Sequence, residues 1–203
     1  MKKLKLAVAV AVAAALPFTA HAAPATWTID GAHSTTGFAV KHLVVSTVRG
    51  QFGKTSGTLH LDDADPSRSS VEAVVDASSI DTQNAQRDAH LASPDFLDVA
   101  KHPTITFRST KVEPHGKDKL VVTGELTLHG VTKPAAFDVT ASPVVKGMAG
   151  ELRRAFSATT RIDRRDYGLR WSKAVEAGPV VGDEVTITLD LEATPEAPKS
   201  AAR

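Results

Sequence analysis

The 203-residue sequence contains no cysteine. Disulfide bonds, thiolate metal sites and cysteine nucleophiles are therefore excluded together. The G-x-S-x-G elbow of serine hydrolases, the P-loop and the G-x-G-x-x-G dinucleotide fingerprint are also missing. The sequence thus makes no positive case for catalysis, and it predicts a protein that is not an enzyme and needs no cofactor.

Metal-binding spacings are missing as well. The chain has no H-E-x-x-H motif and no His-x-His pair, the short spacings that place two ligands on one metal ion. His33 and Ser34 are adjacent, and neighbours on a strand point to opposite faces, so they cannot by themselves form a Ser-His dyad. Isolated histidines are usually hydrogen-bonded structural groups. No metal site is therefore predicted from the histidines beyond residue 22, which are His33, His42, His60, His90, His102, His115 and His129.

Charge of one sign is not concentrated anywhere in the chain. The formal net charge is +1, and it falls to about −2 without the three lysines near the N-terminus. Lysine and arginine are interspersed with aspartate and glutamate, which is typical of a solvated surface. The lack of a basic stripe argues against a nucleic-acid partner.

One long hydrophobic run occurs, and it lies at the N-terminus. Lys2, Lys3 and Lys5 precede the apolar run Leu6 to Leu16, and Ala20-His21-Ala22 forms a small-x-small cleavage site. This order is typical of a secretory signal peptide. The run is much shorter than the roughly 20 residues that span a bilayer, which disfavours an uncleaved anchor. Residues 1–22 are therefore predicted to be a signal peptide that is removed on export, and the mature chain is predicted not to span a membrane.

The mature chain alternates apolar and polar residues with a period of two. The clearest run is Glu184 to Glu192, in which Val185, Ile187, Leu189 and Leu191 would share one face. Similar runs recur between turn-rich segments at 62–70, 114–119, 129–134, 142–150 and 178–183. Several short alternating strands separated by turns predict an all-β antiparallel sheet or barrel.

One segment interrupts this pattern. Asp81 to Leu91 is polar and free of glycine and proline, so it is predicted to be a surface helix, with Asp81 or Thr82 as its cap. The last residues, 194–203, contain two prolines and mostly small or charged side chains, a composition that cannot bury much apolar area. The prediction is a single domain over residues 23–193 followed by a disordered tail over 194–203.

Several linked motifs in this order resemble the YceI-like family of lipocalin-like barrels. The two most specific are QRDAHLASPDFLDVAKHPTITFRS at 86–109 and GELTLHGVTKP at 124–134. They are supported by WTIDGAHSTTGFAVKHL at 27–43, RGQFGKTSGTL at 49–59, IDRRDYGL at 162–169 and VGDEVTITLDLEA at 181–193. The resemblance implies an eight-stranded antiparallel lipocalin-like barrel with a short helical insertion, located in the periplasm. It also implies an isoprenoid or other long-chain amphiphile as the ligand.

If the family's binding mode carries over, the inward apolar face forms a tunnel for the ligand's tail. The predicted wall residues are Phe38, Val40, Phe52, Ile105, Phe107, Leu126, Leu128, Phe137, Phe156 and Ile187. An eight-stranded barrel is just wide enough to be filled by side chains or to hold one small ligand. A filled barrel with a stress or interaction role, and an enzyme acting on a lipid or quinone-like substrate, therefore remain as alternatives. The sequence does not indicate an oligomeric state.

Four basic residues are candidates for contact with the ligand's head group. Arg87 and His90 lie three apart on the predicted helix and share one face, and Arg164 and Arg165 are adjacent guanidinium groups that could grip a phosphate or carboxylate. Arg164 also matches the family's arginine ahead of the element Asp166-Tyr167-Gly168. The alternative for both pairs is a structural ion pair, which is the more common role of such groups.

Overall fold

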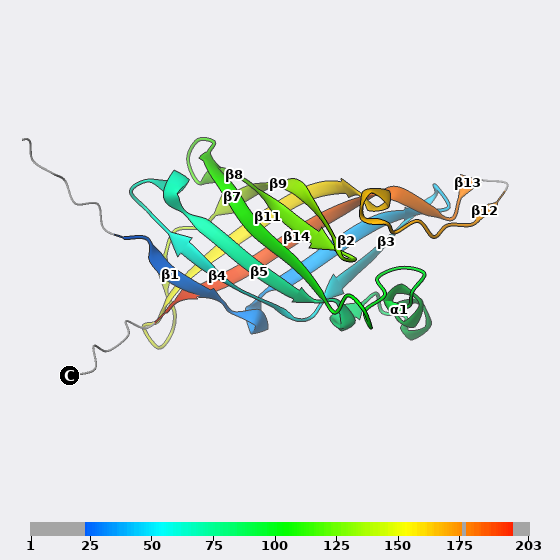
Figure 1. Cartoon of the computed structure of the whole chain (residues 1–203). Coiled ribbons are helices and arrows are strands. Elements are labelled where there is room, and N and C mark those ends of the chain that lie inside the picture. Colours follow the sequence, from blue (N-terminus) through cyan, green and yellow to red (C-terminus); the bar gives the residue numbers. More distant parts are fainter. Residues whose placement is uncertain (1–22, 176–177, 197–203) are drawn as a thin grey trace, which may run out of the picture.

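The computed structural model describes residues 23–175 and 178–196 of the chain (Figure 1). The predicted signal peptide, residues 1–22, lies outside the described residues, as does the predicted tail from residue 197 onward. The strands are β1 (Ala25–Ile29), β2 (Thr35–His42), β3 (Ser46–Phe52), β4 (Thr55–Leu61), β5 (Ser70–Asp76), β6 (Ile80–Asp81), β7 (Thr104–Pro114), β8 (Lys119–Leu128), β9 (Val131–Ala141), β10 (Val145–Lys146), β11 (Leu152–Asp163), β12 (Ala174–Val175), β13 (Gly178–Pro179) and β14 (Val181–Pro195). The helices are α1 (Ala85–Ala92) and the short 3-10 turns η1 (Gly31–His33), η2 (Pro66–Arg68), η3 (Ala77–Ser79) and η4 (Arg164–Tyr167).

The long strands close into an antiparallel barrel of eight strand positions. Going round the barrel, β14 pairs with β11, and β9, β8, β7, β5 and β4 follow in turn. β1 then closes the ring between β4 and the end of β14. β2 pairs with the part of β14 that precedes the part paired with β1, and β3 pairs with β2. β2 and β3 therefore occupy the same two positions in the ring as β1 and β4. The predicted all-β, eight-stranded lipocalin-like barrel is confirmed.

One end of the barrel carries the helix, and the ends of the described chain lie at the other (Figure 1). α1 begins at Ala85 because Asn84 caps it, its side chain accepting from Arg87 N at 3.0 Å. The sequence predicts a helix start at Asp81, but Asp81 belongs to β6. Thr82 does not cap the helix because its backbone N–H and its hydroxyl both donate to Asp88 Oδ1. No helix in the described part of the chain is both long and apolar enough to cross a membrane.

Two other boundaries differ from the predicted ones. β14 extends through Thr194 and Pro195, which pair with Thr28 and Trp27, so the first two residues of the predicted tail are part of the sheet. The turn predicted at 129–134 is a two-residue hairpin of His129 (φ 51°) and Gly130 (φ 72°). Two consecutive positive φ values give the turn whose twist matches that of paired strands. β9 can therefore start at Val131, four residues earlier than a loop ending at Pro134 would allow.

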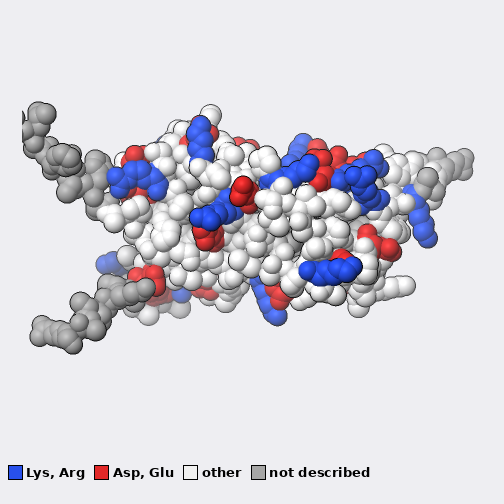
Figure 2. Space-filling view, viewed as in Figure 1, with Lys and Arg blue, Asp and Glu red and all other residues white. Residues whose placement is uncertain are grey.

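Charged side chains of both signs are mixed on the outside of the barrel, as the composition predicts. Figure 2 shows lysine and arginine next to aspartate and glutamate over the visible face. The pairs include Lys54 with Asp76 at 3.4 Å and Lys111 with Glu113 at 2.7 Å. Exposed ion pairs of this kind contribute about 0–1 kcal/mol each, so they do not explain why the barrel is stable.

Candidate functional site

The barrel is hollow. It encloses a cavity of about 250 Å³ lined by side chains from almost every long strand. A buried water needs only roughly 10–15 Å³ of such volume, and close-packed protein interiors contain few voids larger than that. The cavity is therefore too large to be a packing defect in a filled core.

All ten residues predicted to form the tunnel wall line this cavity. They reach it because side chains alternate across a strand, so one face of each strand points inward. On β14 the inward residues are Val185, Ile187, Leu189 and Leu191, while Thr186 and Thr188 are not part of the lining. Their role as ligand contacts stays a prediction, since lining a cavity is geometry and not binding.

Aromatic rings shape the cavity at two places along its length. The rings of Phe107 and Phe137 meet edge to face with centroids 5.1 Å apart, and those of Phe38 and Phe52 are 5.8 Å apart at a tilt of 45°. Offset and edge-to-face contacts are the favoured geometries for aromatic pairs. The rings thus stabilise each other as well as forming wall.

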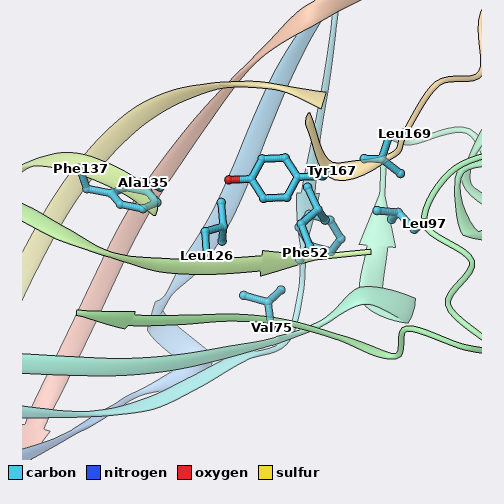
Figure 3. Close-up of a cluster of buried hydrophobic side chains, with 9 residues drawn as sticks. Phe52, Val75, Leu97, Leu126, Ala135, Phe137, Tyr167 and Leu169 are labelled. Carbon is cyan, nitrogen blue, oxygen red and sulfur yellow. The ribbon is translucent and has the colours of Figure 1, made fainter. Parts of the chain in front are cut away.

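The helix end of the cavity is closed by side chains that the strands do not supply. Leu97, from the segment after α1, and Leu169, from the segment after η4, face Phe52 on β3 (Figure 3). Phe96 joins them in the lining. The periodicity of the sequence could not reveal these residues because none of them lies in an alternating strand.

The cavity also spans much of the barrel's length. Its lining runs along β14 from Val181 to Leu191, which at about 3.3 Å per residue corresponds to roughly 33 Å of strand. Strands in closed barrels tilt by about 35–45°, so the axial length is roughly 25 Å. The interior is long and narrow rather than round.

Polar groups are few in the lining, and several of them have partners. Thr36 and Thr55 face each other with their hydroxyl oxygens 2.8 Å apart, both buried. Ser69 lies at the end away from α1, where its hydroxyl accepts from Asp62 N at 3.0 Å. Within the described residues, the cavity walls bring together no nucleophile with a general base.

Arg164 is a buried structural arginine. Its residue is 3% exposed, and its Nε donates to Gly182 O at 2.8 Å. The remaining donors reach four acceptors, namely Leu169 O, Trp171 O at 3.0 Å, Val181 O at 3.3 Å and Asp183 Oδ1 at 3.0 Å. A guanidinium has five N–H donors, and all five are used. Although Arg164 borders the cavity, it has no donor left for a head group.

Burial lowers the pKa of the Arg164 guanidinium, while the neighbouring Asp183 raises it. The group stays cationic because the pKa of arginine starts so high. Next to it, burial raises the pKa of the Tyr167 hydroxyl, and Asp166 adds to the effect. Tyr167 is 2% exposed and points toward Ala135 and Phe137 (Figure 3).

The other three head-group candidates are also held by protein groups, outside the cavity lining. Arg165 pairs with Asp183 at 2.8 Å and its side chain is 54% exposed. Arg87 donates from Nε to Thr82 Oγ1 at 2.7 Å and from Nη2 to Thr82 O at 2.8 Å. These contacts fit the structural alternative, in which the arginines tie their segments to the barrel.

His90 belongs to an aromatic cluster at the helix end. Its Nε2 lies 2.9 Å from Asp95 Oδ2. Its ring is edge-on to Phe96 and to Trp171, with centroids 5.1 and 4.9 Å away. All four basic candidates therefore have protein partners, and His90 packs against the segments that close the barrel.

The described structure also assembles a cluster that the sequence spacing did not indicate. Asp98, His102 and His129 each place one ligand-type atom within 4.8 Å of those of the other two. His102 and His129 are far apart in the sequence, so only the fold brings them together.

The comparisons with known proteins agree with this architecture. The family model of the YceI-like domain matches residues 27–193, nearly all of the described barrel. The chain belongs to the YceI-like family. A UPF0312 protein of Vibrio cholerae serotype O1 is 39% identical over 170 residues, covering 84% of this chain and 90% of that protein. A UPF0312 protein of Vibrio parahaemolyticus serotype O3:K6 is 38% identical over 191 residues, covering 94% and 96%.

Solved structures show the same YceI-like fold. BcnA of Burkholderia cenocepacia is similar with a TM-score of 0.71 and 27% identity, covering 82% of this chain and 99% of BcnA. The YceI protein of Campylobacter jejuni gives a TM-score of 0.64 and 28% identity over 77% of this chain and 90% of that one. A polyisoprenoid binding domain from Saccharophagus degradans gives a TM-score of 0.64 at 16% identity, covering 84% and 98%. The last likeness is one of fold alone.

Proposed function

We propose that this YceI-like protein is a carrier that holds one isoprenoid or other long-chain amphiphile inside its barrel. The observation that carries the proposal is the cavity: about 250 Å³, long, narrow and bounded by apolar side chains. Such a shape fits an extended hydrocarbon chain better than a compact molecule. The fold that it shares with a polyisoprenoid binding domain is consistent with this ligand class.

Chain length rather than head group should set the affinity. Burying a methylene in an apolar site contributes about 0.8 kcal/mol, whereas Arg164, the guanidinium nearest the cavity, has all its donors occupied. Each added methylene that the cavity accepts should therefore strengthen binding by about fourfold. Affinity should stop rising once the chain fills the cavity.

A titration of delipidated protein with isoprenoid alcohols and fatty acids of graded length tests this. Phe107→Ala should shift the preferred ligand chain length upward because it enlarges the cavity next to Phe137. Arg108→Ala, at the next position with its side chain 75% exposed, is the matched control and should bind as the wild type does. No binding at any length by well-folded protein would refute the carrier proposal.

The two alternatives have less support. A filled barrel does not agree with the cavity volume. An enzyme acting on a lipid would need a nucleophile or acid paired with a general base, and the described cavity lining contains hydroxyl groups but no histidine, aspartate, glutamate or lysine. These observations favour the proposed binding role over an enzymatic one.

The proposed location is the periplasm, from the predicted signal peptide at residues 1–22. Intact-mass measurement of protein from the periplasmic fraction should show a chain that begins at Ala23. A dominant species that keeps Met1 to Ala22 would contradict this. Native mass spectrometry of the same sample would show the mass of any amphiphile that is purified with the protein.

A further inference from the structure

Asp98, His102 and His129 form a three-residue cluster at the helix end of the barrel, separate from the cavity lining. Asp98 and His102 lie in the segment between α1 and β7, and His129 lies in the β8–β9 turn. One ligand-type atom from each residue lies within 4.8 Å of the other two. Two imidazoles and one carboxylate this close together are a donor set typical of zinc sites.

The protein positions the three side chains. Asp98 is 7% exposed, and its carbonyl oxygen accepts from His102 N at 2.8 Å, which fixes the two residues relative to each other. The rings of His102 and His129 meet edge to face with centroids 4.7 Å apart. A Cβ at Gly130 would lie 2.6 Å from His102 Cε1, so the glycine leaves room for that ring.

The hydrogen bond of His129 determines which of its nitrogens is free. His129 Nδ1 lies 3.2 Å from Tyr167 O. A carbonyl oxygen can only accept, so Nδ1 carries the hydrogen and Nε2 of the neutral ring carries a lone pair. Metal-binding histidines almost always donate their second ring N–H to a carbonyl or carboxylate in this way.

The negative charge of Asp98 is paired with a lysine that a bound cation could displace. The Asp98 carboxylate is balanced by Lys101, whose Nζ lies 2.9 Å from Oδ2. The Lys101 side chain is 72% exposed, so it can move into solvent if another cation takes its place. Both histidines are half-buried, which leaves the cluster open to solvent on one side.

We infer that Asp98, His102 and His129 bind a divalent transition-metal ion, of which Zn²⁺ matches the donor set best. The ion would have three protein ligands and an open fourth position. It would join the segment after α1 to the β8–β9 turn and, through Tyr167 O, to η4. This inference does not depend on the proposed carrier role, because the cluster is not part of the cavity lining.

Calorimetric titration of the purified protein with ZnCl₂, after treatment with a chelator, tests the inference. We expect one zinc ion per chain. His102→Gln should weaken binding by more than about 100-fold, since loss of even an outer-shell partner costs roughly 10–100-fold. Asp98→Asn keeps the shape of the side chain and should weaken binding in the same direction. Lys101→Ala should strengthen binding because it removes the competing cation.

His33→Gln is the matched control. His33 belongs to the other His and carboxylate group of the described chain, with Asp30 and Glu192. There Arg153 already bonds both carboxylates, with Nη1 3.2 Å from Asp30 Oδ2, so this group should not hold the ion. A cobalt-substituted sample provides a second readout through the visible absorption of its coordinated ion. No zinc binding by the wild type, or binding that His33→Gln abolishes and Asp98→Asn leaves unchanged, would overturn the inference.

Discussion

Filling the cavity from one wall distinguishes a hollow barrel from a packed core by the sign of the stability change. Ala158 lies on β11, is half-buried and lines the cavity. Its neighbours in register, Val139 and Leu189, line the same space. Ala158→Leu adds three carbon atoms to the interior. In a hollow barrel these carbons contribute up to about 2 kcal/mol of stability, at roughly 0.8 kcal/mol per buried carbon.

The same substitution in a close-packed core would cost about 1–3 kcal/mol through overpacking. It should also take room from the ligand, so the longest chains should bind about 2 kcal/mol more weakly, or roughly 30-fold. Ala155→Leu, an exposed position on the same strand, is the control and should change neither quantity much. Urea unfolding and the graded-length titration measure both effects. A destabilised Ala158→Leu variant with wild-type affinity would refute the placement of the ligand in this cavity.

Three further predictions concern the barrel wall and its ends. Ile187→Asp should cost several kcal/mol because it buries an unpaired charge, whereas Thr186→Asp on the other face should cost much less; equal urea midpoints would contradict the strand's register. Arg164→Met should lower stability by about 3–5 kcal/mol, as when a buried pair loses one partner, and Arg165→Met by no more than about 1 kcal/mol; similar thermal shifts would show that Arg164 is not structural. The backbone N–H of Asp65 and the charge of Arg68 hold the pKa of Asp62 below its ordinary value of 3.8, so the unfolded chain takes up the proton more readily and the carboxylate stabilises the fold above that pH. Asp62→Asn should therefore lower stability at neutral pH, and its difference from wild type should shrink as the pH falls below that value; a constant difference would contradict this.

The inward face of the barrel was predictable because one face of each strand meets water and the other meets the apolar interior. Ile187 and Leu189 face the cavity and Thr186 does not, as the alternation alone requires. The sequence could not show whether the inward side chains meet at the centre. That depends on the closed circumference of the sheet, which is a property of all the strands together.

The polar groups at the helix end were less predictable, for a different reason. The acceptors of Arg164 lie 5 to 19 residues away in the chain. The helix begins later than predicted because Asp88 accepts from Thr82 and Asn84 caps the helix instead. Whether a guanidinium is free or fully bonded depends on where neighbouring carbonyls point. His102 and His129 become neighbours for the same kind of reason, since the register of β7 and β8 sets how their ends meet.

The barrel is completed by the last strand of the described chain. β14 is 15 residues long, and it pairs with β11, with β2 and with β1, the first described strand. Contacts between such distant segments are slow to form. A nascent chain that stops before Val181 would leave β2 and β11 each with an unpaired edge, the kind of edge that invites aggregation. The interior is therefore enclosed only once β14 has paired with its three partner strands, and until then the chain presents an open sheet.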